Sequence, residues 1–434
     1  MPTVALYTLG CKVSQYETEA IAEGFERAGF TVVEFDTPAD VYVINTCTVT
    51  AESDRKSRQF IHRAAAMNPS ALVCAVGCYT QRAAEEVAGV EGVSVVIGTA
   101  DKLGVIQIVK EILSGTRQPP FISAPSLDGV GFERMCITRA PRTRAYVKIE
   151  DGCESKCTYC AISAARGPVR SKPMEDIITE VEGLYSRGTR EVVLTGIETG
   201  SWGRDLEGKP TLDSLIRVLD SRHSCERIRL GSLAPELVGE RFAEGVRGCK
   251  ILAPHFHISM QSGSDSVLRA MKRRYTVDMA LRNITALRDA LPDTQLTTDL
   301  MVGFPGESEE DFRMTMELVR KIGFLDVHVF AYSRRDGTPA ASYPDQVPSD
   351  VKKRRSAELI RLKNEVRDSV LSDVCRRGEP LSCILEAEDG GVYTAHSDSF
   401  IELCVAAPSG RQGDAVKVIP VSHKNGIIQA KLLD

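Results

Sequence analysis

Three closely spaced cysteines follow a predicted strand near the middle of the chain. The strand is expected over 145–150, and Cys153, Cys157 and Cys160 come shortly after it with the spacing C-x3-C-x2-C. Three thiolates on one loop can hold three irons of a [4Fe–4S] cluster and leave the fourth iron without a protein ligand. A structural zinc loop is the alternative, but zinc sites usually close with four ligands from paired C-x2-C units. The spacing therefore favours a cluster that can bind a small molecule.

Strand and helix patterns alternate around this loop from residue 144 to about residue 332. Strands are expected at 145–150, 191–195, 227–231, 255–260, 295–302 and 326–330. Six such units predict an incomplete (β/α) barrel, with functional residues at the carboxyl ends of the strands. The cysteine spacing in this setting resembles the signature of the radical S-adenosylmethionine (SAM) enzymes.

Three turns at the carboxyl ends of these strands are candidates for binding SAM. They contain, in chain order, Gly196 and Glu198, Gln261 and Ser262, and Gly303 and Pro305. The first would face the aminoacyl end of SAM, the second its ribose or carboxylate, and the third its adenine. Each turn alone is more often only a barrel turn, but their order behind the cysteine loop favours a cofactor site.

The first hundred residues alternate short apolar runs with amphipathic stretches. Strands are expected at 3–8, 31–35, 41–45, 71–76 and 93–97, and helices at 15–28, 53–67, 81–87 and 102–113. This alternation predicts a small, open, parallel α/β sheet. Ligands of such sheets bind just beyond the carboxyl ends of the strands.

Three more cysteines follow strands of this predicted sheet. Cys11, Cys47 and Cys78 each come directly after an apolar run, and Gly10 and Gly77 would let the backbone turn tightly beside a bulky ligand. Their convergence at one sheet edge predicts a second cluster with an open iron. The alternative is that all three are ordinary loop cysteines.

Motifs in both halves of the chain resemble those of the methylthiotransferases, a family of radical SAM enzymes. The resemblance rests on segments 9–19, 45–50, 77–81, 255–264, 271–276, 298–307 and 328–338. The versions Gly-Cys-Lys-Val-Ser-Gln-Tyr-Glu-Thr and Arg-Arg-Tyr-Thr are most similar to the branch that acts on N6-threonylcarbamoyladenosine in tRNA. The sequence departs from the family pattern at Ser14, Glu198, Ala234 and Ala331.

The resemblance implies two [4Fe–4S] clusters, one on each cysteine trio, and SAM as the cofactor. It implies addition of a methylthio group to C2 of the modified adenine at tRNA position 37, beside the anticodon. The expected partners are the tRNA anticodon loop, an electron donor such as flavodoxin or ferredoxin, and a sulfur source. Isopentenyladenosine tRNA or a ribosomal protein is an alternative substrate, and a non-catalytic iron–sulfur RNA-binding or sensing protein is an alternative of another class.

Composition shifts divide the chain into four predicted parts. Residues 1–118 form the N-terminal α/β domain, 119–143 a linker rich in proline and glycine, and 144–370 the barrel with a basic amphipathic helix at 351–367. Residues 371–434 carry short alternating runs and turns that predict a small all-β barrel. Its position and turn segments look like a TRAM domain, an RNA-binding module of this family.

Contacts to RNA are expected only from local patches, because the net charge of the chain is -5. The candidates are Arg142, Arg144, Arg273, Arg274, Lys417 and Lys424. A solvated linker explains Arg142 and Arg144 as well as a phosphate contact does. The stretch 371–434 has six Lys and Arg against nine Asp and Glu, so RNA binding there requires one local face.

Two pairs of polar residues alternate on predicted barrel strands. Arg227 is expected to form an ion pair with a helix, and either it or Arg229 could meet the SAM carboxylate. His255 and His257 share one face without a recognisable third metal ligand, so packing or substrate contact is expected.

The chain carries no predicted signal peptide and no apolar run of about 20 residues that would span a bilayer. Its thirteen cysteines do not form a secreted disulfide pattern. We therefore expect a cytoplasmic protein without a membrane partner.

Overall fold

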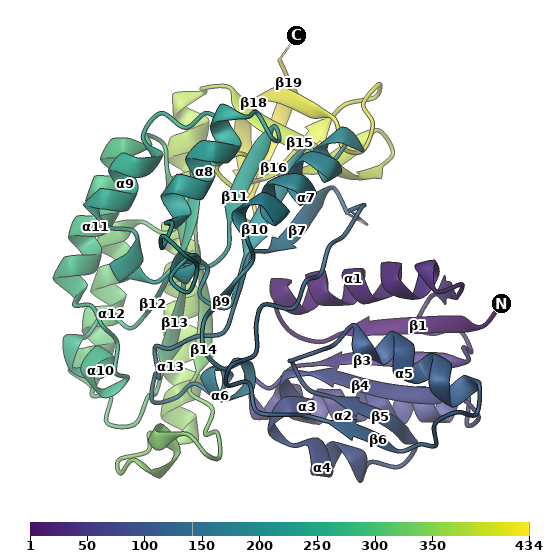
Figure 1. The fold of residues 1–434 in the computed structure, drawn as a ribbon. Helices are drawn as coiled ribbons and strands as arrows, with labels where there is room; N and C mark the ends of the chain where they lie inside the picture. Colours follow the sequence, from purple (N-terminus) through teal and green to yellow (C-terminus); the bar gives the residue numbers. More distant parts are fainter. Residues whose placement is uncertain (141, 434) are drawn as a thin grey trace.

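A parallel sheet, an incomplete barrel and a closed, mainly antiparallel barrel follow one another along the chain (Figure 1). The computed structural model describes residues 1–140 and 142–433, so residue 141 of the predicted linker and residue 434 lie outside the described part. The α/β class with a small all-β C-terminal barrel is confirmed. Within the described residues, no helix has the length and hydropathy that a membrane crossing requires.

The N-terminal sheet has six parallel strands in the order β2-β1-β3-β4-β5-β6. They are β1 (Thr3–Thr8), β2 (Thr31–Val33), β3 (Val41–Thr46), β4 (Leu72–Gly77), β5 (Val93–Ile97) and β6 (Phe121–Ser123). One face packs on α1 (Lys12–Arg27) and α5 (Gly104–Leu113). The other packs on α2 (Ala51–Met67), α3 (Cys78–Arg82) and α4 (Ala84–Ala88).

Two expectations for this sheet need correction. Strand β6 lies inside the stretch predicted as a linker, where it pairs in parallel with β5 and extends the sheet. The helix expected at 81–87 is two short helices, α3 and α4, separated at Ala83, whose backbone is not helical.

Six parallel strands form the central incomplete barrel. One sheet contains β7 (Arg144–Lys148), β10 (Glu191–Thr195) and β11 (Arg227–Leu230), and the other contains β12 (His255–Gln261), β13 (Gln295–Val302) and β14 (Asp326–Ala331). Bridges between Ile228 and Leu252 and between Leu233 and Ile258 join the two sheets into one arc. A short antiparallel pair, β8 (Glu150–Asp151) and β9 (Arg170–Ser171), follows β7.

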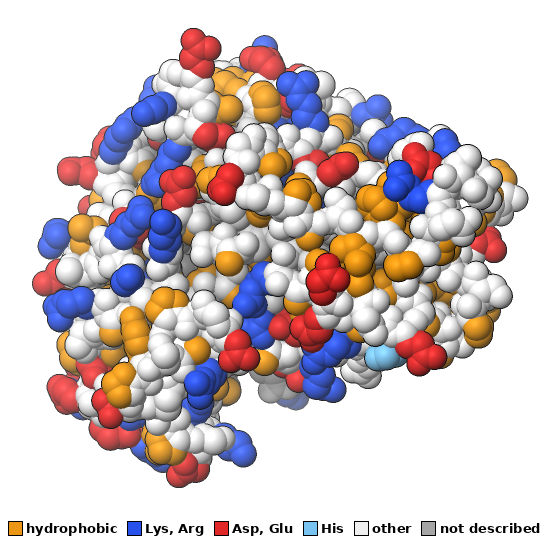
Figure 2. Space-filling model, turned by 60° about the horizontal axis from the view of Figure 1, so that its bottom comes forward, with side chains coloured by type: hydrophobic (Ala, Val, Ile, Leu, Met, Phe, Trp, Pro, Cys, Tyr) orange, Lys and Arg blue, Asp and Glu red, His pale blue; other side chains and the backbone are white. Residues whose placement is uncertain are grey.

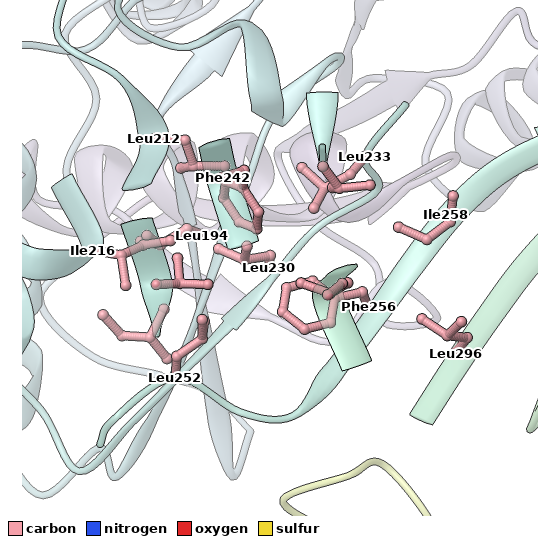
Figure 3. Close-up of a cluster of buried hydrophobic side chains, with 14 of the residues drawn as sticks. Leu194, Leu212, Ile216, Leu230, Leu233, Phe242, Leu252, Phe256, Ile258 and Leu296 are labelled. Carbon is pink, nitrogen blue, oxygen red and sulfur yellow. The ribbon is translucent and has the colours of Figure 1, made fainter. Parts of the chain in front are cut away.

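Helices cover the outer face of this arc. They are α7 (Met174–Ser186), α8 (Leu212–Ser221), α9 (Glu240–Val246), α10 (Asp265–Ala270), α11 (Val277–Ala290) and α12 (Glu309–Ile322). Figure 3 shows strand residues such as Leu230 and Phe256 packed near Ile216 and Phe242 from the helices. Because side chains alternate along a strand, the polar residues between these apolar positions face the lumen.

The C-terminal barrel closes in the order β15-β16-β17-β19-β18. Its strands are β15 (Leu381–Asp389), β16 (Val392–Ser397), β17 (Glu402–Ala406), β18 (Ala415–Lys424) and β19 (Ile427–Leu432). Helix α13 (Ser349–Arg377) runs into it from the central barrel and is longer than the predicted 351–367. It continues until Gly378, whose left-handed backbone ends it.

The C-terminal barrel packs at the amino ends of the central strands. Arg229 forms an ion pair with Glu191 and donates to the backbone oxygens of Ser397 and Asp398. Arg227 forms the expected ion pair, but its partner is also Glu191 of strand β10 and not a helix residue. Phe400 stacks on His255 with 4.6 Å between ring centroids. This end of the lumen is therefore occupied by protein.

Candidate active site

The central cysteine trio lies on the loop between β8 and α6 (Ile162–Arg166). Cys157 is buried, while Cys153 and Cys160 are half-buried. Gly152 has a φ of 94°, and a Cβ there would lie 1.9 Å from the carbonyl oxygen of Pro168. Only glycine fits this close approach, which lets the Cys153 N–H donate to Gly167 across the loop at 3.0 Å.

Arg273 lies against the central trio. Its guanidinium donates to Cys157 Sγ at 3.3 Å and to the carbonyl oxygen of Ser259 at 3.3 Å. Burial alone would lower the pKa of Arg273, but the neighbouring Tyr275, Tyr159 and Cys157 groups raise it. Arg273 is half-buried against the cysteine loop, because the segment after α10 folds back onto that loop, and its contact to RNA stays a prediction.

The N-terminal trio forms where three strands end. Cys11 precedes α1, Cys47 follows β3, and Cys78 begins α3 after β4. These strands are neighbours in the sheet, so the three cysteines lie at one edge. Gly10 lies against Cys47, since a Cβ at Gly10 would be 3.3 Å from Cys47 Sγ. Cys47 and Cys78 are buried, and Cys11 is exposed.

Arg166 connects the two trios. It ends α6, which begins two residues after Cys160, and its Nε lies 3.0 Å from Cys78 Sγ. Five helical residues extend about 7.5 Å. Burial raises the pKa of the Cys78 thiol to about 12, while the charge of Arg166 acts to lower it. The trios therefore lie near the two ends of one short helix.

A buried ionic network holds this arrangement. Arg166 pairs with Glu17 of α1 and Asp151 of β8, and Lys148 of β7 pairs with both carboxylates. Lys102 also pairs with Glu17. Buried charges require such partners, so the network ties the N-terminal domain to the barrel. Figure 1 shows α1 between its own sheet and the barrel strands.

Sequence reasoning missed this network. One signal was present: Glu17 lies at helical spacing among Val13, Ala20 and Ile21, all on the buried face of α1. A charge on an apolar face indicates a buried partner. The sequence contains no comparable signal for Arg166.

Two carboxylates line the turn after β10. Glu150 is fully buried, and its Oε2 accepts the Glu198 N–H at 2.8 Å. Its Oε1 has no hydrogen-bond partner among the described residues. Burial raises the pKa of Glu198 to about 7. Burial also raises the pKa of Cys153, and the Glu198 charge adds to that shift. These oxygens beside the central trio can accept hydrogen bonds from a cationic amino group, such as that of SAM.

Gly196 keeps this turn close to Glu150. A Cβ at Gly196 would lie 2.5 Å from Glu150 Oε2, so a larger residue would push the carboxylate away.

The other two predicted cofactor turns are formed but tightly packed. Gln261 adopts a left-handed φ of 61°, and the Ser262 hydroxyl accepts the Ser264 N–H at 3.2 Å inside the turn. Gly303 lies under Lys352 of α13, where a Cβ would meet the Lys352 side chain at 2.2 Å. Pro305 is buried. Contacts from these four residues to SAM stay a prediction.

The remaining RNA candidates divide into two groups. Arg142, Arg274, Lys417 and Lys424 are exposed. Arg144 forms ion pairs with Glu191 and Glu386, and its side chain is 14% exposed. The prediction for Arg144 is corrected, because the C-terminal barrel covers the start of β7. On the face that Figure 2 shows, basic and acidic side chains are interspersed.

The spacing of the cysteines fits a cluster better than a single metal ion. Tetrahedral zinc with bonds of about 2.3 Å would place its sulfurs about 3.8 Å apart. Within the described part of the chain, the one group with ligand atoms within 4.8 Å of one another contains no cysteine. Both trios are thus more widely spaced than a mononuclear site requires, as a polynuclear cluster allows.

Comparisons with known proteins agree with this geometry. Residues 147–319 match the model of the Radical SAM superfamily, and residues 3–98 match the Uncharacterized protein family UPF0004. A solved radical S-adenosylmethionine methyltransferase, TsrM from Kitasatospora setae, is similar with a TM-score of 0.59 at 15% identity, covering 78% of this chain and 77% of that one. That likeness supports the fold alone.

Two curated relatives extend over most of the chain. Threonylcarbamoyladenosine tRNA methylthiotransferase MtaB from Bacillus subtilis is 38% identical, over 96% of this chain and 93% of the relative. tRNA-2-methylthio-N(6)-dimethylallyladenosine synthase from Carboxydothermus hydrogenoformans is 33% identical, over 83% of this chain and 83% of the relative.

The fold, the cysteine loop and the matched domain define a radical SAM enzyme. The chain belongs to the methylthiotransferase family of these enzymes. SAM and [4Fe–4S] clusters are accordingly its cofactors.

Proposed function

We propose that this protein adds a methylthio group to C2 of N6-threonylcarbamoyladenosine at tRNA position 37, beside the anticodon. The observation that carries the proposal is the pair of cysteine trios near opposite ends of α6. The proposed substrate is the one for which the Bacillus subtilis relative, with 38% identity over 96% of this chain, is named. The dimethylallyladenosine branch, at 33% identity, supplies the second candidate substrate.

In this proposal, Cys153, Cys157 and Cys160 hold the cluster that binds SAM, and Cys11, Cys47 and Cys78 hold an auxiliary cluster. When bound, these groups supply radical generation, the sulfur atom and the methyl group. The protein contributes positioning. Arg273 donates to Cys157 Sγ and Arg166 donates to Cys78 Sγ, so each arginine orients one sulfur of a trio.

The cofactor turn after β10 supplies polar acceptors. Glu150 and Glu198 are assigned to the SAM amino group, because one buried oxygen of Glu150 is otherwise unpartnered. Gly196 keeps the two carboxylates close. Gln261, Ser262, Gly303 and Pro305 are assigned to the remaining SAM contacts through their turns.

The parts of the chain take separate roles in this proposal. Residues 1–118 carry the auxiliary cluster, 119–143 connect the domains, 144–370 form the SAM barrel, and 371–434 form a TRAM-like module.

The substrate adenine enters unstacked from the anticodon loop, as recognition of single-stranded RNA usually requires. Arg142, Arg274, Lys417 and Lys424 are its candidate backbone contacts, and flavodoxin or ferredoxin and a sulfur source are the further partners.

The test is mass spectrometry of tRNA nucleosides from a deletion strain. Loss of methylthio-threonylcarbamoyladenosine, restored by the wild-type gene and not by a Cys153→Ala variant, is the expected result. Unchanged levels of this nucleoside together with loss of the methylthio-isopentenyl nucleoside would show that the enzyme acts on isopentenyladenosine instead. Absence of 5′-deoxyadenosine from the reconstituted, reduced protein would instead indicate a non-catalytic RNA-binding or sensing protein.

A further inference from the structure

Three potential metal ligands, none of them a cysteine, lie together on the lumen face of the barrel. His257 Nε2 of β12 lies 3.2 Å from Asp299 Oδ2 of β13, and His328 Nδ1 of β14 lies 3.2 Å from Asp299 Oδ1. Asp299 and His328 are direct partners in the strand register. The expectation that His257 has no third metal-like partner is thus wrong, because the partners come from strands that are distant in sequence.

The distances in this group suit ligands around a common ion. Two ligand atoms each about 2.0–2.2 Å from one ion lie about 2.9–3.5 Å apart in octahedral or tetrahedral geometry. Both separations of 3.2 Å fall in this range, although hydrogen bonds also reach this length. One ligand atom from each of the three residues also lies within 4.8 Å of the other two.

The surroundings of His257 match those of a metal-ligating histidine. Such residues usually use their other ring nitrogen in a hydrogen bond that fixes the tautomer. His257 Nδ1 lies 3.0 Å from Thr297 Oγ1, so Nε2 is the atom that faces Asp299. The His257 side chain is 9% exposed, whereas that of His328 is 54% exposed, which leaves access from the lumen.

The charge state of Asp299 also suits a metal ligand. Burial alone would raise its pKa, but the hydrogen bonds of His257 and His328 lower it below the usual range. The carboxylate is therefore ionised at neutral pH and able to bind a cation.

We propose that His257, Asp299 and His328 bind one divalent first-row transition-metal ion, separate from the iron–sulfur clusters. Two imidazoles and one carboxylate suit zinc, iron(II) or manganese, and three protein ligands leave open positions for water or an oxygen ligand in the lumen. The proposal does not depend on which nucleoside the enzyme modifies.

The test is equilibrium dialysis of the fully loaded holoenzyme against Zn²⁺, with zinc and iron measured in the same sample. We expect one zinc per chain without loss of iron. Asp299→Asn and His257→Gln should each weaken zinc binding by at least about 100-fold, and Thr297→Val by about 10–100-fold, as loss of an outer-shell partner does. His62→Gln, an exposed histidine on α2, should leave binding unchanged.

Two results would overturn the proposal. One is absence of zinc from the wild-type holoenzyme, and the other is equal zinc affinity in the wild type and in both Asp299→Asn and His257→Gln. Asp299→Asn keeps the side-chain shape, and its iron content reports whether the variant is folded.

Discussion

The two cysteine trios reach similar arrangements by different routes. The central trio comes from a single loop between residues 153 and 160, so its spacing is visible in the sequence. The N-terminal trio comes from the ends of β1, β3 and β4, which become neighbours only when the sheet forms. The first trio depends on a local turn, and the second depends on tertiary structure.

The arginines beside the two trios also differ in whether their contacts are within one domain or between two. Arg273 is partly exposed and reaches Cys157 from within the barrel. Arg166 is fully buried and joins Cys78 to Glu17 and Asp151, which belong to two different domains. The N-terminal trio should therefore be the one that is sensitive to domain docking.

The largest predicted effect separates the two trios by their products. Alanine at Cys153, Cys157 and Cys160 should abolish both 5′-deoxyadenosine and methylthiolated tRNA, because SAM loses its iron site. Alanine at Cys11, Cys47 and Cys78 should abolish only the methylthiolated nucleoside. Chromatography with mass spectrometry of both products checks this prediction. Loss of 5′-deoxyadenosine in both variants would contradict the claim that only the central trio is needed for SAM cleavage.

Glu17→Gln should disturb the N-terminal trio selectively. It removes the carboxylate shared by three buried cations, and breaking a buried ion pair costs about 3–5 kcal/mol. We expect the free energy of unfolding to fall by about that amount and iron to be lost from the N-terminal cluster first. Denaturant unfolding and iron analysis measure both quantities.

Glu226→Gln is the matched control for this change. Its ion pair with Arg190 is exposed, and such pairs contribute about 0–1 kcal/mol. An equal loss of stability in Glu17→Gln and Glu226→Gln would argue against the role of the buried network.

Arg273→Met should have a smaller effect that is confined to the central trio. Hydrogen bonds to charged groups contribute about 1.5–3 kcal/mol, so we expect slower 5′-deoxyadenosine formation with N-terminal iron retained. Arg269→Met, at an exposed position of α10, is the control, because Arg274 itself donates to the Glu154 carbonyl oxygen in the cysteine loop. Identical rates in the two variants would show that the Arg273 contact is dispensable.

Local patterns were sufficient to predict much of the fold. The bounds of β1, β5, β10 and β13 match the expected ranges, because each strand carries apolar or alternating residues up to a turn or loop. The strand β6 was missed, since three residues within a proline-rich stretch carry little periodic signal.

The site was predicted less completely than the fold. Arg144 and Arg273 were named only as RNA-binding candidates, and no sequence pattern indicated that Arg144 pairs with Glu386 of the C-terminal barrel or that Arg273 donates to Cys157. The partners of Arg166 and His257 lie on other elements, and their proximity results from docking that no local pattern encodes.

Iron and sulfide analysis with Mössbauer spectra tests the central claim of two independent cluster sites most directly. The account predicts about eight irons per chain in the wild type and about four in each triple alanine variant, as two three-cysteine [4Fe–4S] sites require. A Cys11, Cys47 and Cys78 triple variant that keeps all its iron and an unchanged spectrum would contradict it.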